Sequence, residues 1–266
     1  MGLNLAYLTL RVPRGDLPRA LTALETIGAV GANLTMPLKS EVLPLLSSCT
    51  AAARAIGAVN SLRRVESHCP DLQHAEDEAT PRASGWEGEN TDWLGWLDSW
   101  DSEIAEPLEG RKAIVLGAGG AAKAIVYALH ARQIGSVAVM RRQWTDTHQW
   151  LPGFSIRALD FSQTTLEAEL EPGCVIINST PIGTWPNSEG RSPLGWPPRL
   201  PAGCVACDLI YNPTRTLWLE QAAKAGARIL GGMGMLVHQA ARAVTWWSGA
   251  TVPPELVKAS EKTPNP

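Results

Sequence analysis

One stretch decides the fold: AIVLGAGGAAK, which runs from Ala113 to Lys123. A short apolar run stops at a glycine cluster and helix-forming residues follow at once, so the stretch predicts a strand, a tight turn and a helix start. Gly117 can supply the turn, and Gly119 leaves room for an anion to approach the backbone. The free N–H groups at the helix start predict a phosphate site. Ala122 would let the helix and the strand pack closely. The alternative to a phosphate site is that the glycines serve only such packing.

Length and composition indicate a globular chain that can form two domains. Of its 266 residues, 45% are hydrophobic and 18% charged, which allows a large core. The formal net charge of -3 argues against a nucleic-acid surface, and no segment has the pattern of a membrane span. The start lacks a signal-peptide pattern, and five cysteines do not resemble a disulfide framework. We therefore expect a cytoplasmic protein with small-molecule partners.

Two groups of residues could bind a metal, but neither predicts a metal site. Cys204 and Cys207 form a CxxC pair, but no second pair stands at metal spacing. We interpret them as buried structural cysteines, with a redox or zinc role as the alternative. His68, Cys69 and His74 lie in a polar stretch that predicts a loop, and no fourth ligand stands nearby. No metal site is predicted.

The N-terminal part of the chain shows alternating strand and helix patterns. A strand is expected at Ala6–Val12, and a helix within 16–27 with Asp16 as its N-cap. Short strands are expected near Gly31 and Ile56. Lys39 then stands at the head of a predicted helix, where the helix dipole favours acids. It is either a solvated surface charge, which the local pattern favours, or a lysine held there for chemistry.

The part that follows the glycine turn has the pattern of a doubly wound parallel sheet. Strands are expected at Ser136–Met140, 173–178 and Val205–Tyr211, the last two running into loops rich in turn residues. Such carboxyl ends of parallel strands are where these sheets bind ligands. A final helix is expected from about Met235 to Trp247.

Two arginines follow the second strand of this sheet, where NAD-binding proteins carry an acid for the ribose hydroxyls. Arg141 and Arg142 instead suit a 2′-phosphate, which predicts NADP(H) over NAD(H). Two solvated charges are the alternative.

Seven segments together resemble the shikimate dehydrogenase family, from about Leu3 to Gly249. They are GANLTMPLK at 31–39, IGAVNS at 56–61, ENTD at 89–92, VLGAGGAAKA at 115–124, NSTPIG at 178–183, DLIYNPTRT at 208–216 and GMGMLVHQA at 232–240. The resemblance implies an α/β fold with a substrate-binding domain at 1–98, completed by 232–266, where a C-terminal helix packs back. It implies a Rossmann-type NADP-binding domain at 99–231.

The same resemblance implies an activity: the reversible, NADP-dependent reduction of 3-dehydroshikimate to shikimate, in chorismate and aromatic amino acid biosynthesis, by a monomer or homodimer. Lys39 matches the family's catalytic lysine, and Asp92 its partner aspartate. Together with Asp92, the substrate would be bound by Thr35, Asn60, Tyr211 and Gln239. The cofactor would be held by Gly117, Ala118, Gly119, Gly120, Ala121, Arg141, Arg142, Ser179, Thr180, Ile210, Gly232 and Met235. A lysine suits the chemistry, because an ammonium can stabilise and protonate a developing alkoxide.

The chain departs from the family pattern at three places. The family begins with a strand and helix that carry an SxS serine pair for the substrate carboxylate, and this pattern is missing here. The usual NRT is replaced by Met140–Arg142, and the acidic stretch 66–84 is longer than usual. We therefore expect the natural protein to begin upstream. We also expect the 266-residue chain to be poorly stable, to associate through an open strand and to bind the carboxylate weakly.

Two alternatives remain open from the sequence. A relative that acts on quinate or aminoshikimate would share these segments, since the missing SxS region would have helped to separate them. A non-catalytic NADP-binding relative is the second alternative.

Overall fold

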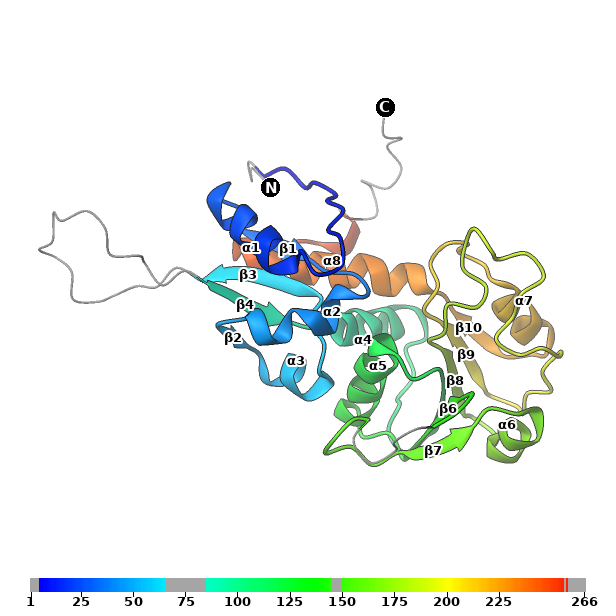
Figure 1. The fold of residues 1–266 in the computed structure, drawn as a ribbon. Helices are drawn as coiled ribbons and strands as arrows, with labels where there is room; N and C mark the ends of the chain where they lie inside the picture. Colours follow the sequence, from blue (N-terminus) through cyan, green and yellow to red (C-terminus); the bar gives the residue numbers. More distant parts are fainter. Residues whose placement is uncertain (1–4, 66–84, 145–149, 256, 258–266) are drawn as a thin grey trace, which may run out of the picture.

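The computed structural model describes residues 5–65, 85–144, 150–255 and 257. Two sheets organise these residues (Figure 1). The smaller has four strands in the order β1-β3-β4-β2, and the larger has six parallel strands in the order β10-β9-β8-β5-β6-β7. The predicted α/β class is confirmed. The stretch 66–84, with its histidines and cysteine, lies outside the described residues.

The larger sheet is the doubly wound sheet that the glycine turn predicts. Its strands are β5 (Lys112–Leu116), β6 (Ser136–Arg141), β7 (Arg157–Asp160), β8 (Val175–Asn178), β9 (Val205–Asp208) and β10 (Arg228–Leu230). Numbered along the chain from β5, the strands lie side by side as 3-2-1-4-5-6, the order of dinucleotide-binding sheets. The strand order reverses between β5 and β8, and ligands bind at such a switch point.

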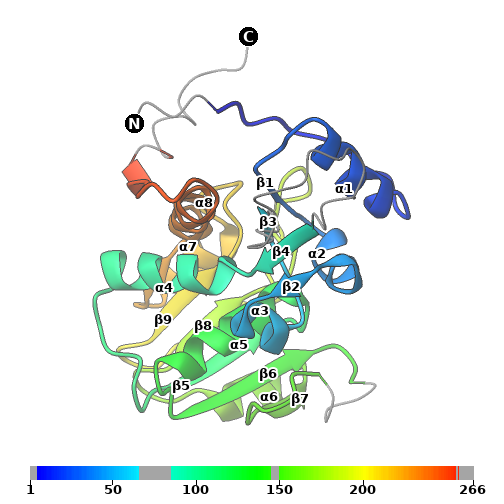
Figure 2. The same ribbon diagram turned by 90° about the vertical axis from the view of Figure 1, so that its left-hand side faces the viewer.

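Helices cover both faces of this sheet (Figures 1 and 2). On one face, α4 (Asp92–Glu103) and α5 (Gly120–Ala131) share a core with Ala113 and Val115. On the other, α6 (Gln163–Glu169) and α7 (Leu217–Lys224) share a core with Ile114. Alternate side chains of β5 therefore enter opposite cores, which explains its unbroken apolar sequence.

The smaller sheet carries the N-terminal helices. Its strands are β1 (Gly31–Asn33), β2 (Ser48–Cys49), β3 (Ser61–Val65) and β4 (Gly85–Glu89). The helices beside it are α1 (Leu17–Thr26), α2 (Leu38–Glu41), the 3-10 turn η1 (Leu43–Leu45) and α3 (Ala51–Ile56). Leu21, Leu62 and Trp86 are buried in their shared core. Thr50 caps α3 by accepting a hydrogen bond from the backbone N–H of Ala53 at 3.2 Å, and Gly57 ends the helix with a φ of 69°.

The strand predicted at Ala6–Val12 is wrong. Residues 5–12 belong to no strand, and β1 has β3 as its one ladder partner in the described part of the chain. A strand needs a neighbouring strand to pair its backbone N–H and C=O groups. No described strand pairs with residues 5–12, so their apolar pattern alone does not make them a strand. Its large apolar side chains Leu5, Tyr7, Leu8 and Leu10 are exposed, but Tyr7 stacks on Trp247 with ring centroids 6.4 Å apart.

Three predicted details also differ. The side chain of Asp16 does not cap α1, and it lies 3.7 Å from Arg19 instead. Strand β9 ends three residues early, because Asp208 turns the chain by accepting the backbone N–H of Ile210 at 3.0 Å. The last helix, α8 (Gly232–Ser248), begins three residues earlier than expected. Glycine at 234 permits this start, since a side chain there would overlap α4.

Helix α8 packs along α4 and returns to the smaller sheet (Figure 2), as the resemblance implies. A Cβ atom on Gly95 of α4 would lie 2.6 Å from the backbone nitrogen of Gln239, so the helices approach closely at this point. Farther along, Trp247 donates from Nε1 to Ser61 Oγ of β3 at 2.9 Å. Among the described residues, no helix has both the length and the apolar character that a membrane crossing requires.

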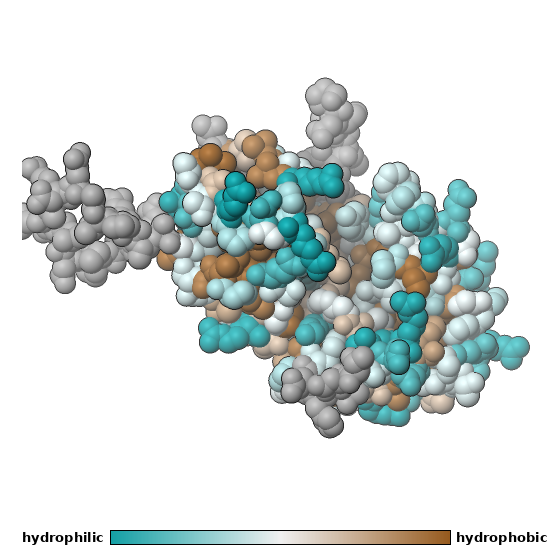
Figure 3. Space-filling view, in the orientation of Figure 1, coloured by the Kyte–Doolittle hydropathy of each residue, from teal (hydrophilic) through white to brown (hydrophobic). Residues whose placement is uncertain are grey.

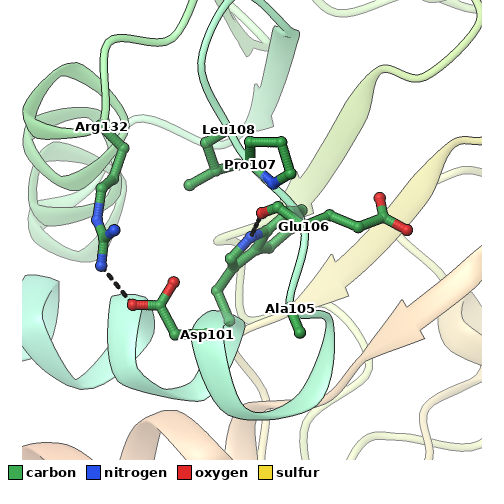
Figure 4. Close-up of a pocket in the computed structure, with 7 residues that line it drawn as sticks. Asp101, Ala105, Glu106, Pro107, Leu108 and Arg132 are labelled. Atoms are coloured by element: carbon green, nitrogen blue, oxygen red, sulfur yellow. Dashed lines mark hydrogen bonds and ion pairs between the residues drawn. The ribbon is translucent and has the colours of Figure 1, made fainter.

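A pocket lies beside the connection from α4 to β5 (Figure 4). It is lined by Trp100, Asp101, Arg132 and residues 105–108. The Asp101–Arg132 ion pair and the 2.7 Å bond from Trp100 Nε1 to the Glu106 carbonyl hold this connection in place. The lining contains none of the predicted site residues.

Candidate active site

Lys39 and Asp92 form the charged centre of the site. Their Nζ and Oδ2 atoms lie 2.7 Å apart, with side-chain exposures of 22% and 8%. Lys39 comes from the short helix α2, and its carbonyl accepts the backbone N–H of Val59 at 2.7 Å. Asp92 is the first residue of α4, where the helix dipole favours a carboxylate. The start of α4 therefore stabilises the Asp92 carboxylate, and the carboxylate positions the Lys39 ammonium through the ion pair.

Asn60 links this pair to the rest of the site. Its Nδ2 donates to Asp92 Oδ1 at 2.8 Å and to Gln239 Oε1 at 3.1 Å. Its Oδ1 accepts the backbone N–H of Thr91 at 2.7 Å, which fixes the orientation of the amide. Asn60 is 2% exposed, so each of these bonds satisfies a group that would be costly to leave unpaired.

Gln239 reaches this network from the other end of the chain. It lies on α8, and its Nε2 donates to the Leu236 carbonyl at 3.1 Å. The close approach of α4 and α8 at Gly95 brings the two helices together here. Four predicted residues, Lys39, Asp92, Asn60 and Gln239, are thus joined by hydrogen bonds.

Thr35 and Tyr211 lie outside this network. Both are exposed, Tyr211 by 49%, and neither hydroxyl makes a hydrogen bond to the described part of the protein. Thr35 precedes Lys39 by four residues, and Tyr211 lies in the loop that follows β9. Their hydroxyls remain available to a ligand.

The glycine turn follows β5 as predicted. Gly117 has a φ of 103°, and a Cβ there would lie 2.7 Å from Ser179 Oγ, so glycine is required for both conformation and space. Gly119 is the N-cap of α5 and makes no side-chain cap bond. A Cβ on Gly119 would meet no atom within 4 Å. Open space thus lies beside uncapped backbone N–H groups, which fits a bound phosphate group.

The glycine turn lies beside the charged network. A Cβ on Gly120 would lie 4.0 Å from Ala58 Cβ, two residues before Asn60. Ile56, Ala58 and Ala124 form a shared buried cluster between the two sheets. Ala121 is the second residue of α5, and Ala118 belongs to the turn, where its carbonyl accepts a bond from Trp150 Nε1 at 2.9 Å. In Figure 3 the surface is hollowed between the lobes that carry the two sheets.

Arg141 and Arg142 stand at the end of β6, next in the sheet to β5. Arg141 is half-buried, and its guanidinium lies 5.2 Å from the ring centroid of Trp144. Trp144 is in turn held by a 2.9 Å bond from Nε1 to the Leu159 carbonyl. Arg142 is exposed. The two arginines therefore differ: Arg141 packs on Trp144, whereas Arg142 is exposed.

The loops after β8 and β9 are built on a buried polar cluster. Asp208 accepts from Asn178 Nδ2 at 3.0 Å, Ile210 N–H at 3.0 Å and Thr216 Oγ1 at 2.6 Å. Burial raises the pKa of Asp208 to about 6, although these hydrogen bonds lower it. Thr180 Oγ1 donates to Asn178 Oδ1 at 2.7 Å. The cluster shapes the loops at the switch point.

The remaining predicted cofactor residues border the same edge. Ser179 Oγ donates to the Leu116 carbonyl at 2.7 Å, directly beside the glycine turn. Gly232 donates its N–H to the Ile210 carbonyl at 3.2 Å, and a Cβ at 232 would clash with that backbone. Met235 is half-buried on α8 and packs against the core that contains α4.

Several residues that shape the site received no role from the sequence. Thr91 fixes the Asn60 amide, and Asn90 Oδ1 accepts the Asp92 N–H at 3.1 Å. Both lie within ENTD, so their position beside Asp92 was an available signal. Trp144 and Trp150 carried no such signal, because their contacts depend on the folding of distant segments.

Two family models match the two ends of the chain. The family model of the shikimate dehydrogenase substrate binding domain matches residues 1–62, and that of the shikimate 5'-dehydrogenase C-terminal domain matches 232–260. Shikimate dehydrogenase (NADP(+)) of Moorella thermoacetica is 34% identical over 95% of this chain and 81% of its own length. The protein of the same name from Methanopyrus kandleri is 33% identical over 97% of this chain and 85% of its own length.

Solved structures give the same result for the fold. Shikimate 5-dehydrogenase of Thermus thermophilus, in complex with NADP(H) and shikimate, has a TM-score of 0.73 and 29% identity, covering 94% of this chain and 84% of that one. The ligand-free 5-ketofructose reductase of a Gluconobacter species has a TM-score of 0.70 and 26% identity, with the same coverage. Since relatives at 33–34% identity span nearly the whole chain, the chain belongs to the shikimate dehydrogenase family.

Proposed function

We propose that the protein catalyses the reversible, NADP-dependent reduction of 3-dehydroshikimate to shikimate. One observation carries the proposal: the Lys39–Asp92 pair, tied by Asn60 to Gln239, lies beside a glycine turn that fits a phosphate group. The names of the relatives, which are NADP-dependent shikimate dehydrogenases, support the choice of substrate and cofactor. In the cell the reaction would belong to chorismate and aromatic amino acid biosynthesis.

The proposed division of labour follows the two sheets. Residues 1–98, completed by 232–266, would bind the substrate, and residues 99–231 would bind the cofactor. Gly119 and the first N–H groups of α5 would hold the pyrophosphate, and Arg141 the 2′-phosphate. The uncapped helix start and the positioned guanidinium support this assignment.

When bound, NADPH supplies the hydride that reduces the ring carbonyl. Lys39 would stabilise the negative charge that develops on the carbonyl oxygen and donate a proton to it from Nζ. Asp92 would orient Nζ through the 2.7 Å contact.

The substrate is a small acid with several hydroxyls, which requires a dense set of polar partners. Asn60 and Gln239 are held in position by the network, and Thr35 and Tyr211 offer hydroxyls that no described residue engages. Each substrate hydroxyl buried without a partner would cost about 1–3 kcal/mol. We propose that these four side chains, with Asp92, select a polyol acid.

The experiment is a substrate panel with the purified 266-residue chain. Oxidation of shikimate, quinate and aminoshikimate is measured as the rate of NADPH formation. Reduction of 3-dehydroshikimate and 5-ketofructose is measured as the rate of NADPH loss. We expect kcat/KM to be highest for the shikimate pair. Faster turnover of quinate, aminoshikimate or 5-ketofructose would move the assignment to that substrate. NADPH binding without turnover of any of these compounds would indicate a non-catalytic relative.

We also propose that the enzyme acts in the cytoplasm, as a monomer or homodimer. The four cysteines that the structure describes are free thiols, as is usual in reducing compartments. Sedimentation equilibrium tests the oligomeric state.

A further inference from the structure

Two buried cysteines face each other between neighbouring strands. The Sγ atoms of Cys174 and Cys204 lie 3.2 Å apart. Cys174 directly precedes β8 and Cys204 directly precedes β9, and the register pairs Val175 with Val205. The two cysteines are therefore direct neighbours across parallel strands, whose spacing of about 5 Å lies within the Cα–Cα range of disulfides.

This pair is not the CxxC pair that the sequence shows. Cys207 lies three residues after Cys204, so their side chains point to opposite faces of β9. Cys207 is buried in the core with α4 and α5, whereas Cys204 and Cys174 are buried with α6 and α7. The sheet itself separates Cys204 from Cys207.

The surroundings of the pair favour thiol chemistry. The hydrogen bond with Cys204 is the main cause that lowers the pKa of Cys174 to about 7, with a smaller contribution from Lys112 and against the opposing effect of burial. Both cysteines lie one residue inside surface turns, where Pro172 and Gly203 are exposed. A local opening of these turns would bring a small reagent to the sulfurs, which are buried in the closed structure.

We propose that Cys174 and Cys204 form a reversible thiol–disulfide couple that low-molecular-weight disulfides oxidise. The Cys174 thiolate attacks one sulfur of the oxidant, forms a mixed disulfide and releases one thiolate. Cys204 loses its proton and attacks the Cys174 sulfur, which releases the second thiol. The protein loses two protons and two electrons, and the oxidant is reduced to two thiols.

The couple lies far along the sheet from the proposed active site. Cys174 and Cys204 precede the amino ends of β8 and β9, while Asn178 and Asp208 end the same strands. The disulfide would link β8 to β9 at their amino ends, opposite the loops that follow the two strands. This site is independent of the proposed reaction.

Peptide mapping tests the proposal. Native protein is incubated with oxidised glutathione, free thiols are alkylated, and the protein is digested with trypsin without reduction. Cys174 falls in the peptide 158–191, and Cys204 and Cys207 fall in 200–215. We expect these two peptides to be linked, with a mass about 2 Da below their sum once any alkyl group on Cys207 is counted, and the link to disappear on reduction with dithiothreitol.

Three variants distinguish a Cys174–Cys204 disulfide from one that involves Cys207. Cys207→Ala should leave the link intact. Cys204→Ala should trap glutathione on Cys174, and Cys174→Ala should abolish the link. Circular dichroism verifies that each variant is folded, and the wild-type peptide map decides the matter if one is not. Unlinked peptides, or a disulfide within 200–215 alone, would overturn the proposal.

Discussion

Asn60 shows how much of this site depends on one side chain. It is buried, and it contacts Thr91 and Asp92 at the start of α4 and Gln239 on α8, which are far apart in sequence. Its carbonyl oxygen is committed to a backbone N–H, so its Nδ2 must point towards the carboxylate. An aspartate at this position would place a second negative charge beside Asp92 without a donor.

Arg141 should determine the preference for NADPH. Its guanidinium is held over Trp144 and can bind a 2′-phosphate through charge-assisted hydrogen bonds of roughly 1.5–3 kcal/mol. Arg141→Ala should therefore lower the NADPH affinity about ten- to a hundredfold, with little effect on NADH, in calorimetric titrations. Arg142→Ala is the matched control and should have a smaller effect, because Arg142 is exposed. An Arg141→Ala variant that keeps its full preference would refute the assignment.

Asp208 should make stability depend on pH. Burial raises its pKa from 3.8 to about 6, so the native carboxyl binds its proton more tightly than the unfolded one. This contribution is present below the unfolded pKa and is lost as the pH rises through about 6. Relative to Asp208→Asn, the wild-type free energy of unfolding should fall by on the order of 2–3 kcal/mol between about pH 4 and pH 7. Urea titrations measure both curves, and parallel curves would contradict the prediction.

At the scale of single residues, the sequence indicates which side chains have catalytic chemistry, but it does not show which side chains contact one another. The residue type and motif make Lys39 and Asp92 candidates, and the structure places them 2.7 Å apart. The partner of Cys204 could not be predicted, because Cys174 is 30 residues away and the pairing depends on strand register. The CxxC spacing pointed to Cys207 instead, which the alternation of β9 places on the other face.

Among the elements, the glycine turn connects sequence, fold and binding most directly. A methyl group on Gly119 would touch no protein atom, but it would fill the space beside the start of α5. Gly119→Ala should leave the melting temperature within about 2 °C of wild type and lower NADPH affinity at least about tenfold. Gly195→Ala is the control, since a Cβ there also meets no atom within 4 Å and no cofactor role is proposed. If Gly119→Ala keeps wild-type affinity, the phosphate does not lie at this turn.

Elements with long apolar runs and clear punctuation were predictable, such as β5, β6 and α5. Short strands were not, because β7 and β10 are three or four residues long and owe their conformation to the neighbouring strand. The segment 5–12 shows the converse: its alternating pattern is that of a strand, but it has no ladder partner in the described chain. Local pattern sets the tendency, and pairing decides the outcome.

At the scale of the whole molecule, the site is assembled from three parts of the chain. Lys39 and Asn60 come from the N-terminal part, Asp92 from the start of α4, and Gln239 from α8. The glycine turn belongs to the other sheet and meets them near Ala58. Hydride transfer between substrate and cofactor requires this kind of junction, since each ligand would be held by a different part of the protein.

The turnover of a Lys39→Met variant tests the central claim most directly, because methionine keeps much of the side-chain length without the charge. Steady-state rates with shikimate and NADP, and with 3-dehydroshikimate and NADPH, are compared with wild type, and NADPH affinity is measured on the same samples. The account predicts that kcat falls at least about 100-fold while NADPH affinity changes by less than about threefold. A variant whose kcat stays within a few-fold of wild type would show that Lys39 is not the proton donor.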